Sequence, residues 1–264
     1  MYNRPVEPAQ SGTNMLLKRD CFGHLVFIKR LMTLGFGLIT YVLYQWLNKT
    51  RIAGTENIER LPDNNVLFVA NHQTYFADVI AMYHVFNSVK WKFRNSITNP
   101  VYLLWPRLNI YYIAAEETMR SGWLPRVLAY AGSVSVRRTF REKNQDVQRP
   151  MRFADITNIG IALDDGWVVT FPQGTTRPNA PGRRGVVYII KRFRPHVIPV
   201  VIDGFGRTFQ KKSLWLKQRG NLLTLRFKPP LAIDPAEDPD LILSRIMEAI
   251  EQQPQPTDDT DDDE

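Results

Sequence analysis

The hydrophobic positions of this chain change their spacing along its length in a way that predicts alternating strands and helices. Short apolar runs between polar residues predict buried strands, and apolar residues three or four positions apart predict helices. The strands are predicted at residues 66–70, 89–94, 167–171, 197–202 and 222–227, and the helices at residues 79–86, 121–131, 156–163 and 239–252. This alternation predicts an α/β fold in which helices flank a mixed sheet.

The N-terminal part has a different pattern, with a polar arm at residues 1–14 and an uncharged, mostly apolar run at residues 31–48. A run of this length is at the short limit for a helix that crosses a bilayer. Tyrosine and tryptophan near one end, with Lys29 and Arg30 at the other, are typical of anchors at a membrane interface. A buried core helix is equally compatible with this length taken alone. The long polar leader argues against a signal peptide.

Two strand ends carry the polar residues that suggest chemistry. His72 follows the strand at residues 66–70, and Asp78 comes six residues later. Residues 171–177, Phe-Pro-Gln-Gly-Thr-Thr-Arg, follow the strand at residues 167–171. A histidine oriented by an aspartate can remove a proton from a hydroxyl group. A glycine-containing loop with an arginine can hold an anion, so the two ends together indicate acyl or phosphoryl transfer to an alcohol.

These blocks resemble those of the glycerolipid acyltransferase family, whose best known members make phosphatidate from lysophosphatidate. The family pattern N-H-x-x-x-x-D is similar to Asn71, His72 and Asp78, although five residues rather than four separate the last two here. The family pattern F-P-E-G-T-R resembles residues 171–177, with Gln173 in place of the glutamate and Arg177 one position late.

Two further blocks follow the family order. Residues 132–138 resemble the pattern G-x-I-F-I-x-R, with Gly132 and Arg138 matching, and residues 197–202 resemble a proline-centred apolar block. The resemblance spans residues 66–203, about half of the chain. It implies a glycerol-phosphate-acyltransferase-like fold with an N-terminal membrane-associated helix, and a fatty acyl group moved from a thioester donor to a lysophospholipid hydroxyl.

The resemblance also implies the roles of individual residues. His72 is expected to be the general base, and Asp78 to orient it. On a regular helix one extra residue would rotate Asp78 away by roughly 100°. We therefore expect the extra residue to lie in non-helical backbone before the helix. The expected substrate-binding residues are Asn71, Arg138, Gln173, Gly174, Thr175, Arg177, Arg183 and Arg184.

Several alternatives remain open on the sequence. Gln173 removes a charge from the family loop, which leaves room for a lysolipid acceptor without a phosphate, for example one that contains an amino acid. The changed spacing also allows a weakened family member that binds lipid or acyl carrier without turnover. Basic and aromatic residues alternate at positions 90–94 and 219–228, which is compatible with a nucleic-acid-binding protein but equally with ordinary strands. We do not expect nucleic acid as a partner.

Composition sets broader limits. The 264 residues, 44% of them hydrophobic, suffice for one catalytic domain, expected at residues 51–253 between the N-terminal segment 1–50 and an acidic disordered tail 254–264. The formal charge is +8, and without the six acids of the last seven residues it is +14. Such a surface favours an anionic membrane or an anionic donor. The expected partners are therefore membrane lipid and acyl-CoA or acyl carrier protein as co-substrate.

Neither a cofactor nor a metal is expected. The single cysteine, Cys21, excludes a disulfide within the chain and a four-cysteine metal site. His24, His84 and His196 do not have the spacing of metal ligands and are interpreted as structural. The lone cysteine is compatible with a reducing compartment, and we expect a membrane-associated protein whose catalytic domain faces the cytoplasm.

Overall fold

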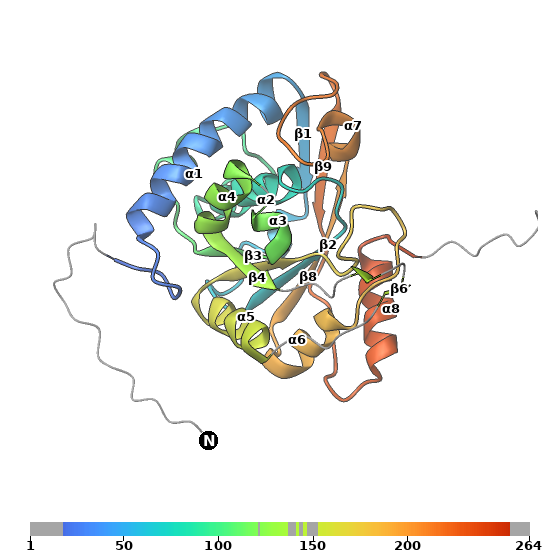
Figure 1. Ribbon diagram of the computed structural model, residues 1–264. Coiled ribbons are helices and arrows are strands. Elements are labelled where there is room, and N and C mark those ends of the chain that lie inside the picture. Colours follow the sequence, from blue (N-terminus) through green and yellow to red (C-terminus); the bar gives the residue numbers. More distant parts are fainter. Residues whose placement is uncertain (1–17, 121, 137–140, 143–144, 147–152, 254–264) are drawn as a thin grey trace, which may run out of the picture.

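A computed structural model describes residues 18–120, 122–136, 141–142, 145–146 and 153–253. Within these residues a seven-stranded mixed sheet has the order β1-β9-β8-β2-β7-β3-β4 (Figure 1). Its strands are β1 Lys49–Ala53, β2 Val66–Ala70, β3 Ile110–Ala115, β4 Ser133–Val136, β7 Trp167–Thr170, β8 His196–Asp203 and β9 Leu222–Phe227. Strand β9 is antiparallel to β8 and parallel to β1, and the other neighbouring pairs are parallel. The predicted α/β fold with a mixed sheet is confirmed.

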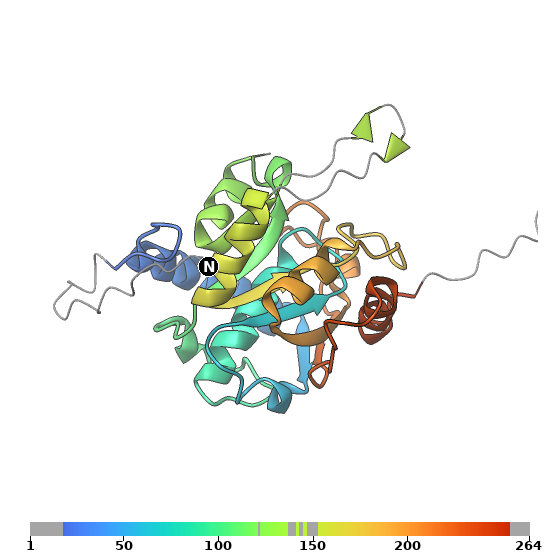
Figure 2. The ribbon, with the colours of Figure 1, turned by 90° about the horizontal axis from the view of Figure 1, so that it is seen from below.

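Helices cover both faces of the sheet (Figures 1 and 2). The long N-terminal helix, α2 and α4 lie on one face, and α5, α6 and α8 lie on the other. The α-helices are α1 Val26–Tyr41, α2 Ala77–Lys90, α3 Glu116–Arg120, α4 Trp123–Gly132, α5 Phe153–Asp165, α6 Gly185–Phe193, α7 Phe205–Thr208 and α8 Pro239–Ala249. The shorter elements are the π-helix η2 Val42–Trp46, the 3-10 helices η3 Thr55–Asn57 and η4 Pro100–Leu103, and the strand pair β5 Arg141–Glu142 and β6 Gln145–Asp146.

Strand β2 shows why the sheet is buried on both faces. All five of its side chains are buried. Because successive side chains of a strand point to opposite faces, Phe68 joins the core under α1 and α2 while Leu67 joins the core under α5, α6 and α8. A strand covered on both faces needs apolar residues at every position, as this sequence has.

The structure corrects some of the predicted elements. Residues 89–94 are not a strand, because α2 continues to Lys90 and Val89 is buried on it. The alternation that suggested a strand arises in the turn that follows, where Trp91 stacks under a guanidinium group. The sequence analysis also missed β1, β3, β4 and α6. Strands β1 and β4 carry exposed positions, so their hydrophobic spacing alone does not identify them.

The N-terminal helical segment packs on the same core as α2. Tyr44 is fully buried, and its hydroxyl group donates to the carbonyl oxygen of Ala77 at 2.9 Å. The opposite face of the helix is exposed and apolar, with Leu31 at 59% and Ile39 at 61% exposure. Among the described residues, 26–46 form the one helix long and apolar enough to cross a membrane. The boundary predicted at residue 50 stays a prediction.

The position of Lys29 contradicts its predicted role as an anchor at a membrane interface. It is buried, and its Nζ atom lies 2.7 Å from the Asp20 carboxylate and 4.7 Å from the centre of the Tyr111 ring. The fold explains the difference, because Lys29 lies on the inner face of α1, toward the start of β3. An ion pair with Asp20 provides the partner that a buried charge requires.

Candidate functional site

The candidate site lies where β2, β7 and β8 end. These strands are parallel, so the residues after each of them meet at one edge of the sheet. His72 follows β2, and its Nδ1 atom lies 3.0 Å from an oxygen of the fully buried Asp78. The carboxylate can only accept, so Nδ1 donates and Nε2 is left as the acceptor. The His72 side chain is 14% exposed, which leaves room for contact with a substrate hydroxyl.

The loop before α2 accommodates the extra residue between His72 and Asp78. Helix α2 begins at Ala77, which places Asp78 in its first turn and the preceding residues in non-helical backbone. The Asp78 carboxylate also accepts from the backbone N–H groups of Gln73 and Thr74, at 2.6 and 3.0 Å, and from the Thr74 hydroxyl at 2.7 Å. These contacts hold the loop closed around the carboxylate, so the added residue does not separate it from His72.

Aromatic packing holds the imidazole from one side. The His72 ring stacks on Phe171, with ring centres 3.9 Å apart and planes 24° apart, and Tyr75 lies parallel at 6.4 Å. Phe171 directly follows β7, so the end of the neighbouring strand helps to orient the His72 ring. The sequence analysis quoted Phe171 as part of a motif but gave it no role, since a sheet neighbour is not visible in a single strand.

Asn71 lies at the same edge of the sheet, but its side chain is hydrogen-bonded to the backbone of a neighbouring strand. Its amide nitrogen donates to the backbone oxygen of Ile202 at 2.8 Å, and its oxygen accepts from the backbone nitrogen of the same residue at 2.7 Å. This pair of hydrogen bonds ties the end of β2 to the end of β8. The structure thus gives Asn71 a positioning contact, and its predicted contact with substrate stays a prediction.

Gln173 lies in the interior of the loop that follows β7. It is buried, and its Nε2 atom donates to the backbone oxygen of Ala180 at 3.0 Å and to the side chain of Gln252 at 3.1 Å. It therefore holds the 174–180 loop against the segment after α8. The structure thus gives Gln173 a positioning contact, and its predicted contact with substrate stays a prediction.

Two of the predicted arginines border this loop without a carboxylate partner among the described residues. Gly174 has a φ of 62°, and a side-chain carbon there would lie 3.0 Å from Nε of Arg183, so glycine lets the guanidinium group pack closely. Arg177 is exposed on the same loop, where the Thr175 hydroxyl accepts weakly from its backbone nitrogen at 3.4 Å. Both guanidinium groups are therefore available to an anion.

The remaining two arginines differ. Arg184 makes a bidentate ion pair with Asp240, at 2.8 and 2.6 Å, which joins α6 to α8. It is therefore engaged in the fold rather than free at the site. Arg138 lies outside the described residues.

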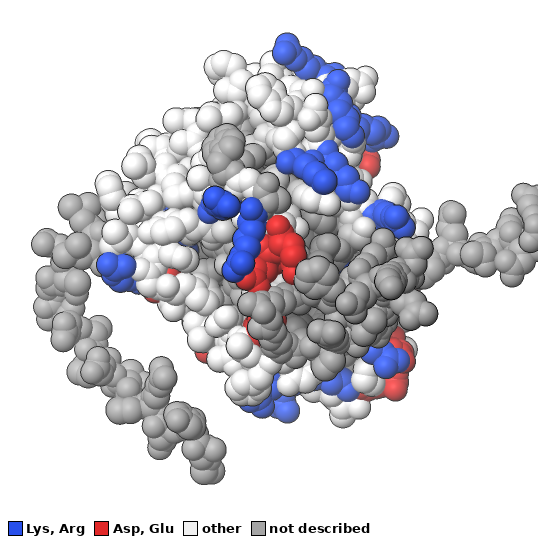
Figure 3. Space-filling view, in the orientation of Figure 1, with Lys and Arg blue, Asp and Glu red and all other residues white. Residues whose placement is uncertain are grey.

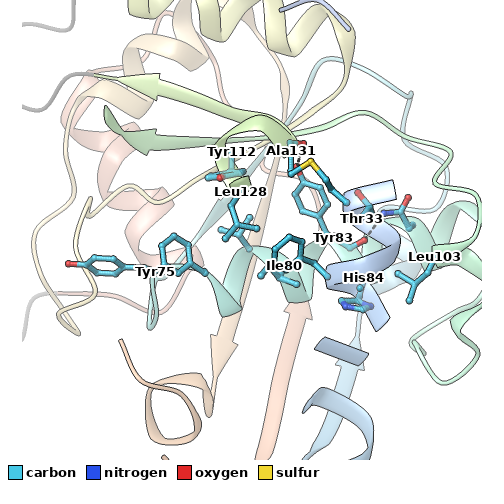
Figure 4. A pocket seen from close by; sticks show the side chains of 15 residues that line it. Thr33, Tyr75, Ile80, Tyr83, His84, Leu103, Tyr112, Leu128 and Ala131 are labelled. Carbon is cyan, nitrogen blue, oxygen red and sulfur yellow. Dashed lines mark hydrogen bonds between the residues drawn. The ribbon is translucent and has the colours of Figure 1, made fainter. Parts of the chain in front are cut away.

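An apolar pocket extends from the site along α2 (Figure 4). Figure 4 shows Tyr75 at one end and His84 and Leu103 at the other. Tyr75 lies parallel to His72, so this end of the pocket is the end nearer the candidate base, which does not itself line the pocket. Its walls come from α1, α2, η4, β3 and α4, with Met32, Phe36, Val79, Ile80, Tyr112 and Leu128 among the lining residues. The sequence analysis did not find this pocket, since it exists only where α1 and α2 pack together.

The surface beside the site is basic. Figure 3 shows lysine and arginine side chains along the upper right of the molecule, over the segment that joins β8 to β9. The exposed cations of this segment are Arg207, Lys211, Lys212, Lys217 and Arg219. The backbone oxygen of Lys211 accepts from the nitrogen of Tyr75 at 2.9 Å, which places the segment next to the site. A negatively charged substrate or surface would be attracted to this edge.

Comparison with known proteins now identifies the family. Residues 49–203, more than half of the chain, match the family model described as Acyltransferase. The chain belongs to the acyltransferase family. A comparison with curated proteins finds no match.

The fold of this acyltransferase is also similar to a solved structure. The crystal structure of the 1-acyl-sn-glycerophosphate acyltransferase PlsC from Thermotoga maritima matches with a TM-score of 0.52 and 17% sequence identity. The match covers 85% of this chain and 77% of the other. The family match and the shared fold confirm the predicted resemblance to glycerolipid acyltransferases. In the described part of the acyltransferase, histidine, cysteine and carboxylate side chains do not gather in a group of three that could hold a metal ion.

Proposed function

We propose that this acyltransferase moves a fatty acyl group from a thioester donor to the free hydroxyl of a lysophospholipid such as lysophosphatidate. The contact between His72 and the buried Asp78 carries the proposal. Nε2 of His72 accepts the proton of the hydroxyl while its oxygen attacks the thioester carbonyl carbon. The carbon–sulfur bond then breaks, and the leaving thiolate takes the proton. Asp78 fixes the tautomer and stabilises the imidazolium that forms between these steps.

The acyl chain would occupy the apolar pocket between α1 and α2. The pocket reaches Tyr75, the neighbour of His72, and its surface is almost entirely apolar, so burial of a hydrocarbon chain there is favourable by about 0.8 kcal/mol for each CH₂ group. Helix α1 is thus a wall of the site as well as the candidate membrane helix. Its exposed outer face would lie in the lipid, which brings the pocket to the surface where lysolipid resides.

The acceptor phosphate would bind to Arg177 and Arg183. Guanidinium groups bind phosphate in a bidentate manner. Arg177 and Arg183 border the loop that begins with Phe171, whose ring stacks on His72. We favour a phosphate-bearing acceptor over one that contains an amino acid, because these two guanidinium groups suit a phosphate. The donor would be acyl-CoA or acyl carrier protein, both of which are anionic, and the catalytic edge would face the cytoplasm. No cofactor enters the proposed reaction.

A thioester-cleavage assay with purified protein and a panel of lysolipids tests this function. We expect turnover with lysophosphatidate, and a fall in rate on the order of 10² to 10⁴ in the variant His72→Ala, because a positioned general base contributes about that much. His196→Ala is the matched control, since His196 is exposed at the opposite end of the sheet. Normal turnover in a folded His72→Ala protein would refute the base, and binding of lysolipid without turnover in the unaltered protein would favour the non-enzymatic alternative.

A further inference from the structure

A second cavity lies at the opposite edge of the sheet from His72. Its lining includes residues that come just before β2, β3 and β7, such as Asp63, Asn109 and Asp165, whereas His72 follows β2. The cavity has a volume of about 250 Å³ and is lined mainly by polar surface. The start of α1, with Lys29 and Arg30, closes it from the other side. No step of the proposed acyl transfer uses this cavity.

The charges around this second cavity are mostly positive. Four cations line it, Lys18, Lys29, Arg30 and Arg107, together with the two acids Asp63 and Asp165. Lys29 is paired with Asp20, and Asp63 is paired with Lys90, so these charges are already compensated. The Asp165 carboxylate accepts from the side chains of Asn109 and Tyr111. Among the described residues, the three cations Lys18, Arg30 and Arg107 are left against the single charge of Asp165, and this balance favours an anion.

The two arginines are held in place by stacking on tryptophan. The Arg30 guanidinium carbon lies 4.6 Å from the centre of the Trp105 ring, and that of Arg107 lies 4.4 Å from Trp91. The Trp91 indole nitrogen donates to the backbone oxygen of Trp105 at 3.1 Å, which joins the two pairs. Within the described residues neither guanidinium group has a carboxylate partner. Two guanidinium groups held by stacking lose little freedom when they bind phosphate.

Asn87 provides an independent observation. It lies on α2, is only 2% exposed, and lines the second cavity as well as the apolar pocket. Its Nδ2 atom donates to the backbone oxygen of Tyr83 at 2.9 Å, but its Oδ1 atom has no hydrogen-bond partner among the described residues. An unpaired buried acceptor is costly, and a ligand hydroxyl is the kind of donor that would satisfy it.

We propose that the second cavity binds a phosphate group esterified to an alcohol that carries a free hydroxyl. Arg30 and Arg107 bind the phosphate, and Oδ1 of Asn87 accepts from the hydroxyl. The volume is below the roughly 300–1,000 Å³ of sites for drug-sized ligands, which suits a glycerol phosphate group rather than a whole coenzyme. The group belongs either to an anionic phospholipid headgroup or to a soluble polyol phosphate.

Binding of three probes to the full-length protein tests this site. Calorimetry with sn-glycerol 3-phosphate and with methyl phosphate measures the soluble ligands, and flotation with phosphatidylglycerol or phosphatidylcholine vesicles measures the lipid. We expect glycerol phosphate to bind more tightly than methyl phosphate, because only the former carries a hydroxyl for Asn87. Stronger flotation with phosphatidylglycerol than with phosphatidylcholine would identify the lipid headgroup as the source, and calorimetric binding without this preference would identify the soluble phosphate.

Variants assign the binding to this cavity. R30Q and R107Q should each weaken it about tenfold or more, because charge-assisted hydrogen bonds are the strong ones. R60Q, at an exposed arginine that does not line the cavity, should leave it unchanged. Glycerol phosphate also resembles the proposed acceptor, so it could bind at the catalytic edge as well as in the cavity. R177Q removes an arginine of the catalytic edge only, and it should therefore retain the binding that belongs to the cavity. Equal binding by R30Q, R107Q and the unaltered protein would overturn the site, and equal affinity for the two soluble phosphates would overturn the role of Asn87.

Binding in the second cavity can be tested separately from the proposed acyl transfer. R30Q and R107Q should retain thioester cleavage with a short-chain, water-soluble acceptor, because neither arginine lines the acyl pocket or touches His72. His72→Ala should lose cleavage and retain binding in the cavity. Loss of both properties together in R30Q and R107Q would count against a separate site.

Discussion

At the scale of single residues, the buried His84 connects α1 to the core. Its Nε2 atom lies 2.8 Å from the Thr40 hydroxyl on α1, and its Nδ1 atom lies 2.8 Å from the hydroxyl of Tyr102 on η4. The Thr40 hydroxyl donates to the backbone oxygen of Phe36, so it accepts from Nε2, and Tyr102 donates to Nδ1. A neutral imidazole satisfies both contacts, and burial lowers the pKa of His84 to about 3.

This histidine predicts a loss of stability in acid. The folded pKa of about 3 lies below the ordinary value of 6.5, so between these values the unfolded chain binds the extra proton. The free energy of unfolding should therefore decrease as pH falls from about 6.5 toward 3. Denaturant unfolding at a series of pH values should show a shallower dependence in His84→Gln, which cannot take up that proton. Identical pH profiles would show that His84 does not control acid stability.

At the scale of elements, the packing of α1 against η4 depends on one glycine. A side-chain carbon at Gly37 would lie 2.5 Å from a methyl carbon of Leu103, whereas one at Gly35 would meet nothing within 4 Å. Both glycines are inside α1. The two positions therefore share a helix and differ in whether the neighbouring element leaves space.

We expect opposite effects from the same substitution at these glycines. Gly35→Ala should stabilise the protein by about 0.5–1 kcal/mol, because alanine favours the helix more than glycine does. Gly37→Ala should lose this gain and destabilise by about 1–3 kcal/mol, because the added methyl forces α1 and Leu103 apart. Thermal unfolding of both variants checks the pair. Equal stabilisation would mean that α1 does not pack on η4 in solution.

At the scale of the whole molecule, the two faces of the continuous helical segment 26–46, which joins α1 and η2, have different surroundings. The inner face buries Tyr44 in the core, so deletion of this segment would expose the core. Its outer face presents Leu31, Ile39 and the 75% exposed Trp46. An apolar face of this kind suits a helix that lies in the plane of the membrane interface.

Substitution on the outer face separates attachment from folding. Leu31→Glu with Ile39→Glu should release the protein from vesicles in flotation at high salt, because each change removes apolar contact and adds a charge that is costly in lipid. Leu241→Glu, at an equally exposed leucine on α8, should stay bound. Activity on a soluble short-chain acceptor should remain in both variants. Unchanged flotation of the double variant would exclude this face as the membrane contact.

The sequence by itself determined the buried strands β2, β7 and β8 and the acyltransferase family. Every position of β2 is apolar because both faces are covered, so residues 66–70 were predicted within their observed bounds. His72 and Asp78 were found because they lie close in sequence, and the contact between them needs only a loop and the first turn of a helix. Local patterns of this kind do not require knowledge of the neighbours.

Tertiary structure decided what each remaining side chain does. Gln173, which lies in the family-like loop, and Arg184 were both expected to bind substrate, yet one supports a loop and the other joins two helices, since their partners Gln252 and Asp240 lie far away in the sequence. Phe171 acquires its role only because β7 pairs with β2. The two cavities exist where separate helices and strand ends meet, so no stretch of sequence contains them. Long-range packing sets these contacts, and the spacing of residues within one element cannot report it.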